Sequence, residues 1–204
     1  MIFVKTPLIL TMAFPGMVWH FTRHLRDKCI HLTFDDGPTP GVTHRVLDRL
    51  KEYHATATFF CLGRNVEKYP EIYDRIVREG HSVGNHTYSH LRGWLVDSLE
   101  YINDVKLAGN YIASDLFRPP YGRIKWAQIK QLKKDYRFMM WDVLSYDFSQ
   151  KITPIQCYTN VANNVRNGSI VVFHDSEKAR RNMEYALPRL LDTFSGTHEF
   201  RGID

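Results

Sequence analysis

The chain has 204 residues, of which 44% are hydrophobic and 24% are charged. This composition excludes a disordered or fibrous chain, and the length suits one domain with a real core. The formal charge of +5 is small and its basic residues are scattered, so it favours anionic surroundings such as a cell wall and gives no reason to expect a nucleic-acid partner.

The N-terminal segment, from Ile2 to Trp19, is rich in apolar residues but is interrupted by Lys5, Pro7, Pro15 and Gly16. Its uninterrupted apolar run is too short to span a bilayer, so we expect no stable membrane insertion. Neither a basic start nor a small-residue cleavage site, the marks of a signal peptide, is clear. We interpret the segment as the first, partly buried piece of the domain, with a targeting or anchoring role as the alternative. A cytoplasmic and a cell-envelope location in a bacterium both stay open.

A short strand is predicted just before two adjacent aspartates. Apolar side chains alternate from 29 to 34, and Gly37 with the proline after it stops the strand. Asp35 and Asp36 therefore stand at a strand end and point in different directions, so one can bind a metal while the other takes a proton. A solvated turn is an equally good interpretation of this hexapeptide alone, because Asp before Gly is a routine turn choice.

Beyond Asp36 the apolar pattern switches repeatedly between helical and strand spacing. It predicts helices at 43–54, 70–79, 95–105, 124–132, 154–165 and 177–191, and strands at 57–62, 82–84, 116–117, 137–143 and 169–173. Strands that alternate with helices imply parallel β–α units, and about seven such units suit a barrel. The three cysteines, Cys29, Cys61 and Cys157, are far apart in apolar contexts, so we expect buried thiols rather than disulfides or a thiolate metal site.

Chemistry in such barrels gathers at the C-terminal ends of the strands. The residues that fall at or just beyond a predicted strand end are Asp35, Asp36, His86, Arg118, Asp147 and His174. We therefore expect polar groups from the whole chain to converge on one mouth.

His86 and His90 are four residues apart, which would place two imidazoles on one face of a helical turn, with Cβ atoms about 5–6 Å apart. Two imidazoles and one carboxylate are three protein ligands, which leave a coordination position for water, as in catalytic zinc sites. The alternative is a chance pair of surface histidines in a chain that has ten.

Two further segments carry polar groups on stiff or buried backbone. In Arg118-Pro119-Pro120-Tyr121 the prolines have no N–H, so the Tyr121 amide is the first free donor and could form half of an oxyanion hole. A proline turn with an exposed tyrosine is the plainer interpretation. His174 ends an apolar strand; such a histidine is more often structural, yet its ordinary pKa suits a proton donor near neutral pH.

Taken together and in this order, the motifs Thr-Phe-Asp-Asp-Gly-Pro, His-Thr-Tyr-Ser-His, Arg-Pro-Pro-Tyr-Gly and Val-Phe-His resemble those of the polysaccharide deacetylases, also called carbohydrate esterase family 4 or the NodB homology domain. The resemblance extends over about 29–191 and implies a single domain, 1–204, with a distorted (β/α) barrel of seven or eight strands. It also implies metal-dependent cleavage of an amide C–N bond, which removes N-acetyl groups from N-acetylglucosamine-type glycans such as peptidoglycan or chitin and releases acetate.

The resemblance also implies a role for each matching residue. Asp36, His86 and His90 would bind one divalent metal, for which we expect Zn²⁺, although Co²⁺, Ni²⁺ or Mn²⁺ also suit this donor set. Asp35 would be the general base and His174 the general acid. The substrate side of the site would comprise Arg118, which holds Asp35, the oxyanion donor Tyr121 with Pro120, and Trp141 and Val172 around the acetyl methyl group.

The sequence departs from the family's motifs at two positions. The fourth motif usually reads Trp-x-x-Asp-x-x-Asp-Trp, with its first Asp supporting the histidine acid, but this chain has Leu144 there. Either Asp147 or Asp142 then serves His174, or no carboxylate does; we favour Asp147. The fifth motif has Val172 in place of the usual Leu.

Other functions are compatible with the same residues. An O-acetyl xylan esterase or a non-sugar amidase could use the same site. A catalytically silent glycan-binding domain would be marked by a missing base or ligand, and none is missing in this sequence.

Overall fold

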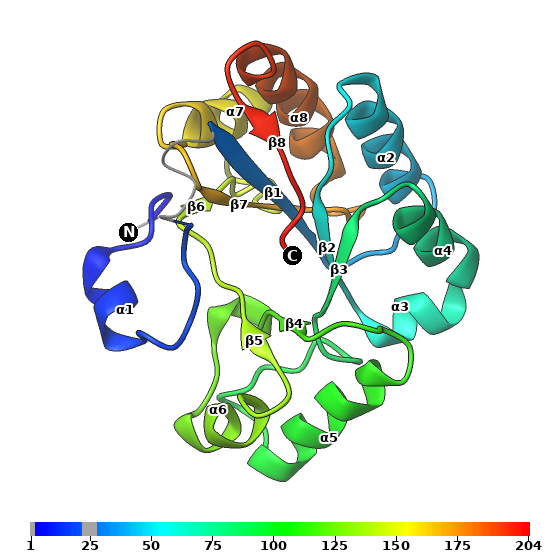
Figure 1. Ribbon diagram of the computed structural model, residues 1–204, viewed down its shortest axis with the longest axis vertical. Helices are drawn as coiled ribbons and strands as arrows, with labels where there is room; N and C mark the ends of the chain where they lie inside the picture. Colours follow the sequence, from blue (N-terminus) through cyan, green and yellow to red (C-terminus); the bar gives the residue numbers. More distant parts are fainter. Residues whose placement is uncertain (1–2, 22–27) are drawn as a thin grey trace.

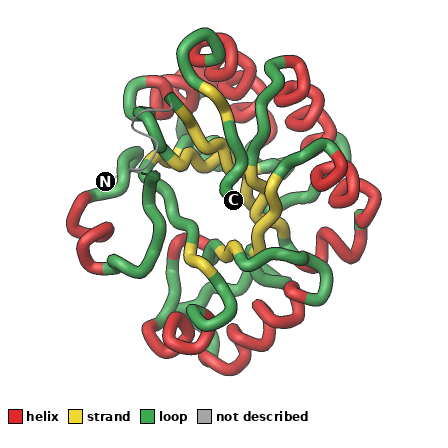
Figure 2. The backbone as a smooth tube through the Cα atoms, in the orientation of Figure 1, coloured by secondary structure: helices red, strands yellow, loops and turns green. Residues whose placement is uncertain are grey.

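The computed structural model describes residues 3–21 and 28–204, in which the strands form a curled sheet at the centre and helices lie outside it (Figure 1, Figure 2). Residues 1–2 and 22–27 belong to the predicted domain, and Ile2 to the predicted N-terminal segment, but they lie outside the described ranges. The strands are β1 (Cys29–Asp35), β2 (Thr58–Cys61), β3 (Ser82–Asn85), β4 (Leu116–Phe117), β5 (Arg137–Phe138), β6 (Val143–Leu144), β7 (Ile170–His174) and β8 (Glu199–Phe200). The helices are α1 (Leu8–Ala13), α2 (Val42–Glu52), α3 (Gly63–Lys68), α4 (Pro70–Arg78), α5 (Ser98–Gly109), α6 (Trp126–Leu132), α7 (Pro154–Ala162) and α8 (Arg180–Phe194).

The sheet has the order β5-β4-β3-β2-β1-β7-β6, and β8 also pairs with β1. Every ladder between these strands is parallel, so their C-terminal ends share one edge. The predicted distorted (β/α) barrel of seven or eight strands in a single domain is therefore confirmed.

The central strands β1 and β7 are buried on both faces, as strands of a parallel barrel are. In β1, Ile30, Leu32 and Phe34 belong to the large core beneath α2 and α8. The alternate residues Thr33 and Asp35 point to the barrel interior, where both contact the Arg118 side chain. The two-residue period of the strand thus separates a helix-facing apolar row from a polar row that leads to the mouth.

The N-terminal segment lies along the seam between β5 and β6. Val18 exchanges backbone hydrogen bonds with Phe138 and Met140, and Val4 accepts one from Leu144, so the segment contacts both sides of the seam. Helix α1 has no buried residue. The segment is thus the partly buried first piece of the domain over its described residues, and none of the described helices has the length and apolar character to cross a membrane.

The predicted strand at 137–143 is wrong as one strand, because it breaks into β5 and β6. Between them, the carbonyl oxygens of Met139 and Met140 accept hydrogen bonds from the Arg118 guanidinium at 3.0 and 2.9 Å. Carbonyls turned toward an arginine no longer continue a ladder with a neighbouring strand.

The predicted helix at 95–105 begins later than expected, and two of its apolar markers, Leu95 and Leu99, are exposed. Asp97 caps the N-terminus of α5 by accepting from the Leu99 N–H at 2.8 Å, so the helix starts at Ser98. Helices α1 and α3 and strand β8 were not predicted. The expectation of buried thiols rather than disulfides is confirmed for Cys29, Cys61 and Cys157.

Candidate active site

A cavity of about 710 Å³ lies at the C-terminal edge of the sheet. The predicted site residues that line it are Asp35, Asp36, His86, His90, Tyr121, Trp141, Val172 and His174. Three other predicted site residues, Arg118, Pro120 and Asp147, are buried and do not line the cavity. The proline that lines it is Pro119. The convergence expected from the strand ends is thus present.

Asp36, His86 and His90 form a compact group in which one oxygen and two nitrogen atoms all lie within 4.8 Å of one another. Oδ1 of Asp36 is 3.1 Å from Nε2 of His90 and 3.7 Å from Nε2 of His86. Three potential metal ligands from two strand ends therefore point at one small volume.

The two histidines do not lie on a helical turn, so that part of the prediction is wrong. Strand β3 ends at Asn85, and the chain continues as a loop in which Thr87 and His90 have φ angles of 69° and 60°. Asn85 Oδ1 accepts from the Thr87 N–H, and Asp104 Oδ2 accepts from the two N–H groups that follow. These side-chain acceptors replace helical hydrogen bonds and still bring the two imidazole centroids to 5.2 Å.

The protonation of His86 suits a metal ligand. Its Nδ1 is 2.7 Å from the Arg118 carbonyl oxygen, which can only accept, so Nδ1 carries the proton. Burial lowers the pKa of His86 to about 4, so the ring is neutral and its Nε2 offers a lone pair toward Asp36.

Asp36 adds a second acceptor at the same point. Its Oδ1 is buried, and among the described residues no group donates a hydrogen bond to it. Burial acts to raise the pKa of Asp36, but the close contact with Nε2 of His90 and the charge of the His174 imidazole outweigh it and hold the pKa below its ordinary value. Oδ1 of Asp36 therefore faces the lone pair on Nε2 of His86 with no proton between them, an arrangement that a cation satisfies.

Asp35 is held by the buried guanidinium of Arg118. Nη1 of Arg118 donates to Asp35 Oδ1 and to Thr33 Oγ1, each at 2.7 Å, and the guanidinium lies 4.1 Å from the Phe60 ring centre. Because Nε and Nη2 bind the two methionine carbonyls described above, the arginine cannot turn away. Asp35 is thereby fixed with Oδ1 engaged, while the residue still lines the cavity.

His174 contacts Asp147, and not Asp142. Nδ1 of His174 is 2.7 Å from Asp147 Oδ1, and the His174 backbone N–H donates to Asp147 Oδ2 at 2.6 Å. Burial acts to lower the pKa of His174, but the charge of Asp147 and its hydrogen bond raise it to about 9. Asp142 instead accepts from the side chain of Ser169 and the backbone of Ile170, so it supports the strand rather than the cavity.

Tyr121 sits at a tight turn with a φ of 60°. The N–H groups of the two following residues bond to Pro119 and Pro120, and no bond from the Tyr121 N–H is found within the described part of the chain. Its ring is half exposed and packs on His90 with centroids 4.7 Å apart. The amide is therefore available as a donor beside the metal-ligand group.

Asp175 is a residue that the sequence analysis missed. Its backbone N–H donates to the Asp35 carbonyl at 3.1 Å, and its Oδ2 accepts from Thr43 Oγ1 at 2.6 Å. A Cβ on Gly37 would lie 2.0 Å from that Oδ2, so only glycine fits. Burial raises the pKa of Asp175 to about 7. The signal was its place directly after His174, at the end of β7.

Fold and site together define a parallel (β/α) barrel protein whose mouth combines a candidate metal-ligand group with a separate carboxylate and a charged histidine. The sequence profile described as polysaccharide deacetylase matches residues 22–140. Two relatives, both named peptidoglycan-N-acetylglucosamine deacetylase and both from Bacillus cereus, are 38% identical over 156 residues and 34% identical over 172 residues. The first match covers 72% of this chain and 56% of the relative, and the second covers 81% of each.

Solved structures agree with the sequence comparison. The crystal structure of the Bc1960 peptidoglycan N-acetylglucosamine deacetylase superimposes with a TM-score of 0.78 and 28% identity, and covers 97% of this chain and 95% of that one. This chain belongs to the polysaccharide deacetylase family, whose deacetylases depend on a metal. It spans about half the length of the first relative above.

Proposed function

We propose that this chain is a metal-dependent deacetylase that removes N-acetyl groups from N-acetylglucosamine-type glycans and releases acetate. One observation carries the proposal: a single cavity brings together three potential metal ligands, the Asp35 carboxylate held by an arginine, and the charged imidazole of His174. The names of the relatives support an acetylated peptidoglycan or chitin-like substrate.

Asp36, His86 and His90 would hold the metal. Two imidazole nitrogens and one carboxylate oxygen match the ligand sets of catalytic zinc sites, so Zn²⁺ is our first choice, and Co²⁺, Ni²⁺ or Mn²⁺ would also fit. When bound, the metal would polarise the acetyl carbonyl group and make water at its open position more acidic.

Asp35 would act as the general base. Its Oδ1 is engaged by Arg118, so Oδ2 is the oxygen free to take the proton from the attacking water. The arginine fixes the direction of the carboxyl group through this charged hydrogen bond.

His174 would act as the general acid. With its Nδ1 proton held by Asp147, the proton on Nε2 is the one that can pass to the amide nitrogen as the C–N bond breaks. Without this proton the sugar amine is a very poor leaving group. Asp147 is thus the positioning residue for the acid.

The remaining residues would position the acetyl group. The Tyr121 N–H would donate to the carbonyl oxygen as negative charge develops there; the loss of such a donor in other enzymes costs about 2.7–4 kcal/mol. Trp141 and Val172 line the same cavity and would surround the acetyl methyl group.

Metal analysis beside an acetate-release assay tests the proposal. We expect Asp35→Asn to keep the metal and lose nearly all turnover, whereas His86→Ala loses the metal. His198→Ala, a histidine outside the cavity, is the matched control and should change neither quantity. An active Asp35→Asn protein would remove the proposed base.

The substrate is tested with acetylated peptidoglycan, chitin oligomers and acetylated xylan, each with and without chelator. Acetate release from the first two, abolished by chelator and restored by Zn²⁺, is the expected result. Release from xylan alone would favour the esterase, and binding without release from any glycan would favour the silent domain.

A further inference from the structure

Beyond the residues of the proposed reaction, the cavity wall carries three cation–aromatic pairs. Arg92 lies over Tyr121, Arg123 over Trp94 and Lys178 over Phe148, with the charged group 5.0, 5.1 and 5.6 Å from the ring centre. All six residues line the cavity. None of these side chains has a role in the deacetylation steps above.

In two of the pairs the aromatic ring also contacts a histidine of the site. The Tyr121 ring packs on His90 with centroids 4.7 Å apart, and Arg92 lies over the same ring. The Phe148 ring packs edge-on against His174 at 5.0 Å and carries Lys178. One aromatic ring therefore contacts both Arg92 and His90, and another contacts both Lys178 and His174.

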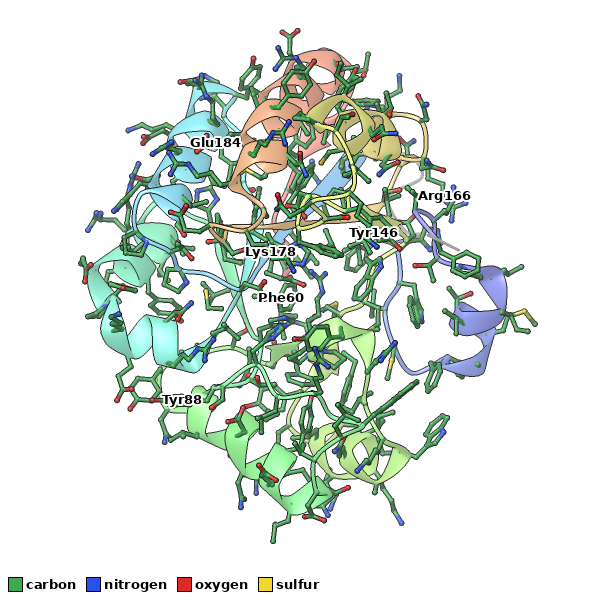
Figure 3. The ribbon with its side chains drawn as sticks, turned by 180° about the vertical axis from the view of Figure 1, so that it is seen from behind. Phe60, Tyr88, Tyr146, Arg166, Lys178 and Glu184 are labelled. Carbon is green, nitrogen blue, oxygen red and sulfur yellow. The ribbon has the colours of Figure 1, made fainter. Side chains whose placement is uncertain are left out.

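The third pair, Arg123 over Trp94, also lines the cavity. Nε1 of Trp94 donates to the Ile124 carbonyl at 3.0 Å, which fixes the indole while 56% of the residue stays exposed. Arg123 lies over that ring. A fixed, exposed aromatic face beside a cavity is a pre-organised surface for a sugar ring. In Figure 3, Lys178 is labelled near the centre of the view and Tyr146, another residue of the wall, to its right.

The three cations have no acidic partner among the described residues. Within residues 3–21 and 28–204, the only carboxylates that line the cavity are Asp35 and Asp36, which are committed to Arg118 and to the metal-ligand group. None of the three cations is in an ion pair with a described residue, whereas the exposed arginines Arg45, Arg49 and Arg137 each pair with a carboxylate. The positive charge is therefore available to a ligand.

We propose that Arg92, Arg123 and Lys178 select an anionic glycan, one in which a sugar next to the acetylated residue carries a carboxylate. The inference rests on the proposed deacetylase function and narrows its substrate class. A neutral homopolymer of N-acetylglucosamine would offer no carboxylate to these three cations. An alternating glycan of N-acetylglucosamine and N-acetylmuramic acid presents lactyl carboxylates on both sides of each acetylated glucosamine.

The test compares two forms of one substrate: an oligosaccharide of alternating N-acetylglucosamine and N-acetylmuramic acid with free carboxylates, and the same oligosaccharide with those groups converted to methyl amides. The metal-loaded protein is assayed for acetate release at low and high salt. The variants are Arg92→Gln, Arg123→Gln, Lys178→Gln and the triple substitution. Lys134→Gln, which removes an exposed charge outside the cavity, is the matched control.

The wild-type protein should prefer the charged form, and salt should reduce that preference. Because an exposed ion pair contributes up to about 1 kcal/mol, we expect each single substitution to lower kcat/KM for the charged form about two- to fivefold. If the three effects add, the triple substitution should lower it at least about tenfold. The neutral form and the Lys134→Gln control should change less than about twofold. Equal use of both forms by the wild type, or equal losses on both forms in the variants, would overturn the selection.

Binding separates this inference from the reaction. Calorimetric titration of both oligosaccharides into Asp35→Asn protein, with and without the three substitutions, measures selection in the absence of turnover. A charge-dependent preference in binding without acetate release by the wild type would refute the deacetylase and keep the selection. Acetate release without such a preference would keep the deacetylase and refute the selection.

Discussion

Replacement of Asp147 by asparagine tests the proposed acid most directly. The substitution keeps the size of the buried side chain but removes the charge that contacts His174 Nδ1 at 2.7 Å. The pKa of His174 is raised to about 9 because Asp147 outweighs the effect of burial. Without the carboxylate, burial acts with less opposition, and we expect the pKa to fall to about 6.5, the ordinary value for histidine, or below.

The size of the effect depends on pH. With a pKa of about 9, about nine-tenths of His174 is protonated at pH 8; with a pKa of about 6.5 the fraction is about 3%. We therefore expect kcat/KM for acetate release to fall roughly thirtyfold at pH 8 but less than about twofold at pH 6. The alkaline limb of the pH profile should move down by about two units or more.

The same pair predicts how stability changes with pH. A histidine whose pKa is higher in the folded state stabilises the fold fully below its unfolded pKa of about 6.5 and loses that contribution as pH rises through about 9. The shift corresponds to on the order of 3 kcal/mol of unfolding free energy, measured by urea denaturation of metal-free protein across this window. Asp147→Asn should remove the pH dependence.

Asp142→Asn is the matched control, because Asp142 is also a buried carboxylate near β7 but has no contact with His174. It should leave the shape of the pH profile unchanged. NMR titration of the His174 ring would report its pKa directly. A pH profile that is the same in wild type and Asp147→Asn would refute the assignment of Asp147 as the partner of the acid.

Three further substitutions have clear expected outcomes. Arg118→Met should destabilise the protein by about 3–5 kcal/mol in urea denaturation, because it leaves a buried carboxylate unpaired, whereas Arg137→Met, which breaks an exposed pair, should cost less than about 1 kcal/mol. Gly37→Ala should weaken metal binding in a metal titration, because its Cβ collides with Asp175 and displaces the turn that carries Asp36. His174→Ala should slow acetate release with little change in bound metal; full activity would mean that another group donates the proton.

The parts of the fold that could be predicted from the sequence are those fixed by local pattern. The alternation in β1 and the Gly-Pro stop after Asp36 place the two aspartates at a strand end, and the structure agrees. The single strand predicted at 137–143 was wrong because its break depends on Arg118, about 20 residues earlier in the chain. A side chain that binds carbonyls at such a distance leaves no trace in local propensity.

Long-range contacts also decide the parts of the site that local pattern leaves open. The order of motifs was enough to bring Asp36, His86 and His90 to one cavity, but the backbone of the histidine loop is set by Asp104, a side chain from α5. The choice between Asp142 and Asp147 likewise depends on which carboxylate packs beneath β7. Spacing alone treats the two as equivalent.

Backbone strain explains why these loops resist prediction. Non-glycine residues rarely adopt positive φ, and each instance costs on the order of 1–3 kcal/mol. Of the six such residues in the described part of the chain, four line the cavity, namely Asp36, His90, Tyr121 and Tyr146, and a fifth, Thr87, is buried in the loop that carries His90. Glycine would relieve the strain, but it would remove a carboxylate and an imidazole that the metal-ligand group requires. The surrounding structure compensates with fixed contacts, such as the Asn65 amide that donates to the Asp36 carbonyl at 2.8 Å. A site that needs particular side chains on backbone suited to glycine must therefore be held by the rest of the fold, and propensity at those positions points away from the conformation that the chemistry requires.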